Sequence, residues 1–178
     1  MKKKDWHIVP ECYIDTNLTE FLLKSPGVNH KSGCNEVAKS MAESRLKEQF
    51  SIGVIDNDKR QPSYVKEFVE IAHTNHISLL KHKERPHYFV RVSPAMDGFI
   101  LDCANELGIN LKDYGLPSTL EELTKVTKDV KAKDDARFKD LFKSLKNSEE
   151  MTKLRMVLNY LNDNQYKCDT AELQQIFK

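Results

Sequence analysis

The sequence predicts an α/β fold, with a mostly parallel sheet flanked by helices and followed by a helical C-terminal extension. Short β-branched apolar runs alternate with amphipathic segments as far as about residue 107. One run, Ile52 to Ile55, stops at Asp56-Asn57-Asp58, as a buried strand does at the ligand-bearing edge of an open sheet. Beyond residue 134 every apolar stripe has helical spacing. Alternating strands and helices favour parallel pairing with helices on both faces.

The individual elements follow from the spacing of apolar residues. Apolar runs predict five strands, at residues 6–9, 28–30, 52–55, 77–81 and 87–92. Helical spacing predicts helices at residues 15–24, 35–49, 63–72 and 96–107. The lysine-rich stretch 120–133 predicts a short helix and then an exposed linker, and further helices follow from residue 134. We therefore expect an α/β domain over residues 1–115 and a helical C-terminal lobe over residues 116–178.

Composition excludes several classes of protein. The four cysteines are widely spaced and form no CxxC pair, so neither a disulfide framework nor a zinc knuckle is indicated, and a cytoplasmic location fits best. No apolar stretch is long enough for a signal peptide or a membrane span, so no membrane partner is expected. The net charge is only +1 although 31% of the residues are charged, so any basic surface must be local. Nothing in the sequence fixes the oligomeric state, and a homo-oligomer stays open.

Acidic residues follow two of the predicted strands. Glu11 follows the first strand, Asp15 begins the next helix, and Asp56 and Asp58 follow the strand at 52–55. Carboxyl ends of parallel strands share one edge of a sheet, so these acids can converge on Mg²⁺, which takes oxygen ligands. A two-metal phosphoryl-transfer site needs such convergence. Two alternatives stay open: a plain strand-ending turn, and the metal and nucleotide-sugar site of a glycosyltransferase.

Basic residues supply candidate phosphate contacts. Lys59 lies beside the acid pair and, facing a metal, would offset charge in a transition state. Basic residues interleaved with aromatic residues suit nucleic-acid binding, because cations neutralise phosphates while rings stack on bases. The candidate nucleic-acid contacts are Lys31, Arg60, Lys81, Lys83, Arg85 and Arg91. A solvated edge loop is the alternative for the cluster at residues 81–91. A zinc site built from His73, His76, His82 and His87 is a weaker alternative, because the spacing matches no standard pattern.

The order of these motifs resembles the Toprim domain over roughly residues 5–95. The resemblance rests on Glu11-Cys-Tyr-Ile-Asp15, a helix, a short strand ending near Gly33, a second helix, and Ile55-Asp56-Asn57-Asp58. Topoisomerases, bacterial primases, recombination-mediator proteins and overcoming-lysogenization-defect nucleases share this domain. Two positions depart from the family pattern: Cys12 stands where a glycine often follows the glutamate, and the paired glycines before the second helix are reduced to Gly33-Cys34.

The resemblance implies a Mg²⁺ or Mn²⁺ site in which Glu11, Asp15, Asp56 and Asp58 are ligands, and Glu11, Asp56, Asp58 and Lys59 serve catalysis. It implies a metal-dependent nuclease acting on DNA or RNA, of the kind found in anti-phage defence. The segment Pro94 to Leu101 also resembles a segment of defence-associated Toprim proteins that has an acid at the position of Asp97. In this chain Asp97 could be a further metal ligand or a helix-start charge, and the helix-start charge is slightly favoured. The alternative is a non-catalytic or partner-activated subunit that binds an ATPase partner.

Overall fold

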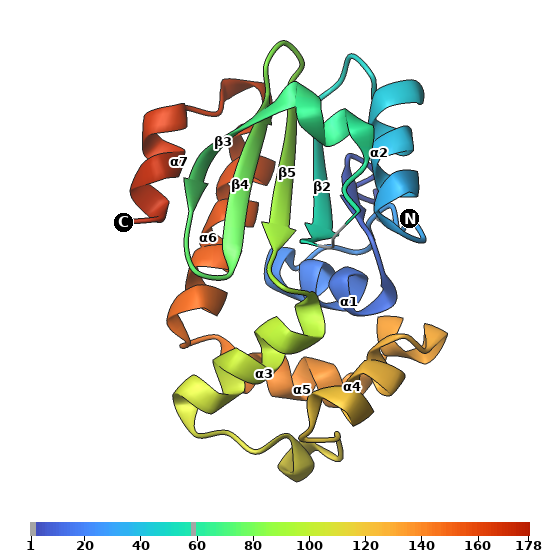
Figure 1. Ribbon diagram of the computed structural model, residues 1–178, viewed down its shortest axis with the longest axis vertical. Coiled ribbons are helices and arrows are strands. Elements are labelled where there is room, and N and C mark those ends of the chain that lie inside the picture. The colour runs from blue at the N-terminus through green and yellow to red at the C-terminus, as the bar shows by residue number, and fades with distance from the viewer. Residues whose placement is uncertain (1–2, 58–59) are drawn as a thin grey trace.

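The computed structural model describes residues 3–57 and 60–178 (Figure 1). Five strands form one sheet in the order β1-β2-β5-β4-β3. The strands are β1 (Ile8–Pro10), β2 (Ser51–Asp56), β3 (Phe68–His73), β4 (Ile77–His82) and β5 (His87–Val92). The α-helices are α1 (Tyr13–Leu23), α2 (Cys34–Glu43), α3 (Met96–Leu107), α4 (Leu120–Thr127), α5 (Ala136–Leu145), α6 (Glu149–Asn164) and α7 (Thr170–Ile176). Short 3₁₀ helices are η1 (Ser63–Glu67), η2 (Leu111–Tyr114), η3 (Val130–Lys133) and η4 (Gln165–Lys167).

The α/β class is confirmed, and the sheet is mixed. β1, β2 and β5 pair in parallel, whereas β4 runs antiparallel to both of its neighbours. Four strands therefore point in one direction and only β4 opposes them. In Figure 1 the arrows of β2 and β5 point toward α1 and α3, which lie beyond the carboxyl edge of the sheet.

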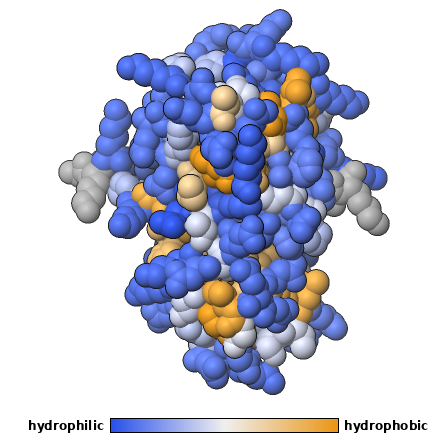
Figure 2. Space-filling model, turned by 90° about the vertical axis from the view of Figure 1, so that its left-hand side faces the viewer, coloured by the Kyte–Doolittle hydropathy of each residue, from blue (hydrophilic) through white to orange (hydrophobic). Residues whose placement is uncertain are grey.

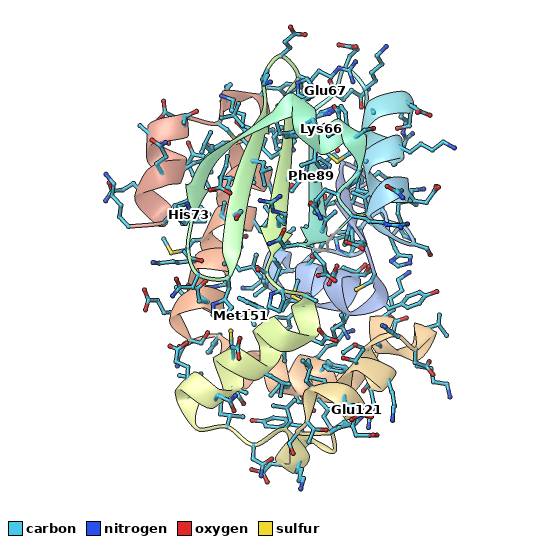
Figure 3. The ribbon with its side chains drawn as sticks, viewed as in Figure 1. Lys66, Glu67, His73, Phe89, Glu121 and Met151 are labelled. Carbon is cyan, nitrogen blue, oxygen red and sulfur yellow. The ribbon has the colours of Figure 1, made fainter. Side chains whose placement is uncertain are left out.

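Helices cover both faces of the sheet because β2 alternates its side chains between them. Ile52 and Val54 face a core shared with α1, α3, α5, α6 and α7. Ile55 faces a smaller core formed with α2 and η1. Gly53 also lies on the α2 side, where a Cβ atom would come within 2.5 Å of the Phe89 ring and 2.8 Å of the Met41 sulfur. Phe89, labelled on β5 in Figure 3, thus occupies the space that Gly53 leaves.

The C-terminal helices belong to the same body as the sheet. Buried residues of α5, α6 and α7 lie in one hydrophobic cluster with those of β1, β2 and β5. The predicted short helix is α4, and the exposed linker after it is confirmed in part: residues 128–131 are exposed, whereas Ala132 is buried and its carbonyl oxygen accepts a hydrogen bond from the Asn17 amide at 2.8 Å. The domain boundary at residue 115 stays a prediction, although these helices share their core with the sheet.

Two predicted elements are wrong. The expected helix at 63–72 is the 3₁₀ helix η1 followed by strand β3. The expected strand at 28–30 is a connection that makes one isolated bridge, Asp5 to Val28, although Asn29 N–H donates to the Ile8 carbonyl. The strand at 87–92 and the helix at 96–107 have the predicted bounds. The other predicted strands and helices are present with shifted bounds, and the helix predicted at 35–49 ends six residues earlier, at Glu43.

The β3 edge of the molecule is mostly hydrophilic, with small separate apolar patches (Figure 2). Half-exposed apolar side chains include Val69 on β3 and Met156 on α6. Isolated apolar residues of this kind are normal on protein surfaces. No helix in the described part of the chain has the length and apolarity needed to cross a membrane.

Candidate metal site

The carboxyl ends of the parallel strands carry the acidic residues. Glu11 directly follows β1, and Asp56 is the last residue of β2, in register with Val92 of β5. The chain turns from β1 into α1 within two residues, which puts Asp15 in the first turn of that helix. Adjacent parallel strands and a short strand-to-helix turn therefore bring these acids to one point, although Glu11 and Asp56 are 45 residues apart.

Carboxylate oxygens of Glu11, Asp15 and Asp56 all lie within 4.8 Å of one another. Among residues 3–57 and 60–178, this is the one group of three or more acidic, histidine or cysteine side chains with the spacing of a metal site. Glu11 and Asp56 are half-buried, and Asp15 is completely buried. The structure thus brings together three of the four predicted ligands, and their role in metal binding stays a prediction.

Backbone hydrogen bonds hold two of the acids in place. The Asp56 N–H donates to Oε2 of Glu11 at 2.8 Å, and the Met96 N–H donates to Oδ1 of Asp56 at 3.0 Å. Asp56 therefore places negative charge at the N-terminus of α3, where the helix dipole stabilises it. Helix capping alone explains the position of Asp56, but it does not explain why two further acids face it.

Asp15 is the feature that capping leaves unexplained. Its side chain has 0% exposure, and neither carboxylate oxygen has a hydrogen-bond partner. The Cys12 thiol lies beside it without the geometry of a hydrogen bond. Burial, and then the negative charge of Asp56, raise the pKa of Asp15 well above its usual range. An unpaired buried carboxylate is costly, and a bound cation is one of the few partners that relieves that cost.

Asp97 differs from this group because both of its oxygens are used. Oδ1 accepts a hydrogen bond from the Gly98 N–H at 2.9 Å, and Oδ2 accepts one from the Thr124 hydroxyl at 2.5 Å. Asp97 lies in the first turn of α3, where a negative charge is favourable. These contacts favour the helix-start role that the sequence left open, and they connect α3 to α4.

A pocket of about 540 Å³ opens at this edge of the sheet. Glu11, Asp56 and Asp97 lie in its lining, and Thr127 and Lys128 of the α4 region form another part of the wall. Sequence reasoning missed this wall, because the lysine-rich stretch carries no motif and looked like a short helix and a linker.

Cys12 also lines this pocket, at the position where the Toprim resemblance has a glycine. Burial and the neighbouring Asp15 carboxylate raise the pKa of its thiol. The thiol is therefore held in its protonated form, which is a poor nucleophile and a poor metal ligand.

The predicted site residues next to the acids fall into two groups. Asp58 and Lys59 lie outside the described residues. Lys31 lies at the acidic edge, where its N–H donates to the Pro10 carbonyl at 3.0 Å. Arg60 is exposed, and its carbonyl oxygen accepts a weak hydrogen bond from the Cys34 thiol at 3.6 Å.

The predicted basic cluster at residues 81–91 does not gather at the acids. Lys83 and Arg85 belong to the turn between β4 and β5, at the end of the sheet opposite the carboxyl edge. Glu67, labelled in Figure 3, marks that opposite end, and its carbonyl accepts from the Lys83 N–H. The Arg85 guanidinium lies 5.9 Å from the centre of the Tyr64 ring.

Two other members of that cluster have protein partners. The Lys81 ammonium donates to the Thr170 hydroxyl at 3.3 Å, and the Arg91 guanidinium pairs with the Glu70 carboxylate at 3.5 Å. Arg91 is in register with Ile55, next to Asp56, but its guanidinium is paired with Glu70. Lys81, Lys83 and Arg85 lie toward the opposite end of the sheet, so the cluster does not form a continuous track to Asp56.

The histidines do not build the alternative zinc site. Three of them pair with carboxylates and one with a tyrosine: His73 with Glu70, His76 with Asp102, His82 with Glu67, and His87 with Tyr64. No set of three ligands that includes a histidine exists in the part of the chain that the structure describes.

Comparison of the chain with protein-family models, with curated proteins and with solved structures finds no match.

Proposed function

We propose that this chain is a Mg²⁺- or Mn²⁺-dependent nuclease, or a related phosphodiester-processing protein of the Toprim type, acting as an effector in anti-phage defence. Glu11, Asp15 and Asp56 would bind the metal. The observation that carries the proposal is the buried Asp15 carboxylate, which has no hydrogen-bond partner and lies within 4.8 Å of two other carboxylates. The Toprim resemblance adds Asp58 as a further ligand and Lys59 as a charge-stabilising group.

The ligand set suits the proposed ion. Three carboxylates supply only oxygen, which Mg²⁺ and Mn²⁺ prefer over nitrogen and sulfur. A divalent cation bound there would polarise a phosphate oxygen and lower the pKa of an attacking water. The side chains have distinct parts in this arrangement. Backbone N–H groups orient Asp56 and Glu11, while complete burial of Asp15 excludes water from one side of the site.

The surroundings of the acids suit a phosphodiester. The pocket of about 540 Å³ admits a nucleotide-sized group. Lys31 and Arg60 lie near the acids and would neutralise flanking phosphates, which supports a nucleic-acid substrate.

A cleavage assay tests the proposal. Labelled DNA and RNA oligonucleotides would be incubated with the protein in EDTA, in Mg²⁺ and in Mn²⁺. Cleavage is expected only with metal, and Asp56→Asn should abolish it while keeping an oxygen that accepts from the Met96 N–H. Asp163→Asn removes one exposed carboxylate of α6 and is the matched control. Cleavage by Asp56→Asn at the wild-type rate would reject the catalytic site.

The second candidate function is a partner-activated or silent subunit that binds an ATPase. It is favoured by one feature, the Cys12 side chain in the pocket wall where the family pattern has glycine. Metal binding without cleavage of any oligonucleotide, together with activity that appears when an ATPase partner is added, would support this function over the first.

A further inference from the structure

A second hollow lies at the opposite end of α1 from the acids. It has a volume of about 660 Å³, and four cationic side chains from three helical regions line it: Lys24, Lys143, Lys146 and Arg155. We call these four residues the basic groove. Phe21 and Leu22 give it an apolar floor. None of these residues belongs to the predicted site, and the groove shares none with the acidic pocket.

The positive charge of the groove is largely uncompensated. Its one acidic lining residue, Glu20, already accepts a hydrogen bond from the Val28 N–H at 3.1 Å. Lys143 pairs with Asp140 at 3.5 Å, but both side chains are more than 60% exposed, and such a pair contributes little. Within residues 3–57 and 60–178, Lys24, Lys146 and Arg155 make no ion pair.

This concentration of charge is local. The whole chain has a net charge of only +1, with 28 basic and 27 acidic residues. Four cations around one hollow therefore depart from the average surface, and like charges held together this way repel one another unless an anion neutralises them. Several cations on one short track, rather than one cation in a tight cage, match a polyanion with regularly spaced charges.

We propose that the basic groove binds the phosphate backbone of a nucleic-acid strand whose scissile bond lies at the acidic pocket. The inference rests on the proposed function, because it assigns the remote part of that substrate. Asp15 and Lys24 are nine residues apart along α1, which corresponds to about 14 Å at 1.5 Å per residue. At about 3.4 Å per nucleotide in one strand, the groove meets the strand at least about four nucleotides from the cleaved bond.

Salt-dependent binding tests the groove without any cleavage. The probe is a fluorescent 20-nucleotide single-stranded DNA, titrated in EDTA at several salt concentrations. Each phosphate contact on a single strand contributes about −0.7 to the slope of log K against log salt, so Lys146→Gln/Arg155→Gln should reduce the slope by about 1.4. Between 50 and 200 mM salt, the wild-type protein should therefore lose about sevenfold more affinity than this variant.

Lys47→Gln/Lys112→Gln is the matched control, because it removes two exposed cations outside the groove and makes the same change in net charge. Equal slopes for the groove variant and this control would overturn the proposal. So would absence of binding by the wild-type protein, or binding of phosphatidylserine vesicles in place of the oligonucleotide.

Substrate length separates this proposal from the proposed function. In Mn²⁺, the groove variant should cleave a dinucleotide or trinucleotide as the wild-type protein does and should lose rate only on longer strands. If the groove variant cleaves long strands at the wild-type rate, the proposed role of the groove is overturned, but the proposed metal site is not affected. If Asp56→Asn loses cleavage but still binds the 20-nucleotide strand in EDTA, with the wild-type slope of log K against log salt, the proposed role of the groove in binding is retained.

Discussion

Replacing Asp15 with asparagine should stabilise the metal-free protein and remove its response to metal. Burial and the charge of Asp56 raise the pKa of Asp15 above its usual value of 3.8, so the folded protein binds this proton more tightly than the unfolded chain does. Between 3.8 and the folded pKa, stability therefore falls as pH rises, and the loss is complete above the folded pKa. Each unit of the pKa shift costs about 1.4 kcal/mol there. The Asp15→Asn variant cannot ionise and escapes this loss.

The assay is thermal unfolding in EDTA and in Mn²⁺ over a range of pH. For a domain of this size, a change of 1 kcal/mol in the free energy of unfolding shifts the melting temperature by about 2–4 °C. At high pH, each unit by which the pKa of Asp15 is raised should therefore make the melting temperature of the variant about 3–6 °C higher than that of the wild-type protein. The difference in melting temperature between the two proteins in EDTA should widen as the pH rises above 3.8, and it should become constant above the folded pKa of Asp15. Mn²⁺ at 100 times its Kd should stabilise the wild-type protein by about 2.7 kcal/mol, or about 5–11 °C.

In Mn²⁺ the wild-type protein should have the higher melting temperature, because the Asp15→Asn variant lacks a charged ligand and is stabilised little by the ion. Asp163→Asn should behave as the wild-type protein in every condition. The reasoning is refuted if the gap in EDTA does not change with pH, which would make Asp15 an ordinary buried polar residue. It is equally refuted if Mn²⁺ raises the melting temperature of Asp15→Asn as much as that of the wild-type protein.

Three further predictions concern the surroundings of the site. Gly53→Ala should destabilise the fold by about 1–3 kcal/mol in denaturant titrations, because its Cβ would meet Phe89 and Met41, whereas Gly98→Ala, with its nearest neighbour at 3.5 Å, should be neutral or stabilising. The melting temperature of Asp97→Asn should still rise in Mn²⁺, because both Asp97 oxygens already accept hydrogen bonds, from the Gly98 N–H and the Thr124 hydroxyl. Loss of that rise would indicate that Asp97 is a metal ligand. Burial lowers the pKa of His87 below its usual 6.5, so the unfolded chain binds a proton more tightly than the folded protein does. The free energy of unfolding should therefore fall as the pH drops below about 6.5, and His87→Gln should weaken this pH dependence. An unchanged pH dependence in His87→Gln would contradict the role given to His87.

The convergence of the acids could be predicted because it needs little more than strand order. Glu11 and Asp56 each follow an apolar strand, and Asp15 begins a helix one turn after Glu11. Parallel pairing of β1 with β2 then brings them to one edge. The complete burial of Asp15 could not be predicted from local spacing, because α1 packs against α3, η3, α5 and α6, which all come much later in the chain.

The errors have a common physical origin in elements at the edges of the sheet. Val65, Phe68, Val69 and Ala72 have helical spacing, but Phe68 packs beside Phe89 and Val69 is 50% exposed on an edge strand. Such a strand buries only some of its side chains, and a register shift between Glu70 and Ala72 breaks its alternation further. Local spacing therefore resembled a helix, and only pairing with β4 decides that the segment is a strand.

The positions of the basic residues could not be predicted for a similar reason. Proximity in sequence grouped Lys81, Lys83 and Arg85, but the turn between β4 and β5 carries the last two to the far end of the sheet. The basic groove instead brings Lys24, at the end of α1, together with residues of the α5 and α6 region that are more than a hundred positions further along the chain. No local pattern signals such a cluster, because it forms only when the helices pack.

The most direct test of the metal site is a crystal structure of the protein grown with Mn²⁺ and measured at a wavelength where manganese scatters anomalously. The account predicts an anomalous peak coordinated by oxygens of Glu11, Asp15 and Asp56, and loss of that peak in the Asp15→Asn variant. A structure with saturating Mn²⁺ and no peak among these three carboxylates would contradict it, as would a peak whose ligands leave out Asp15.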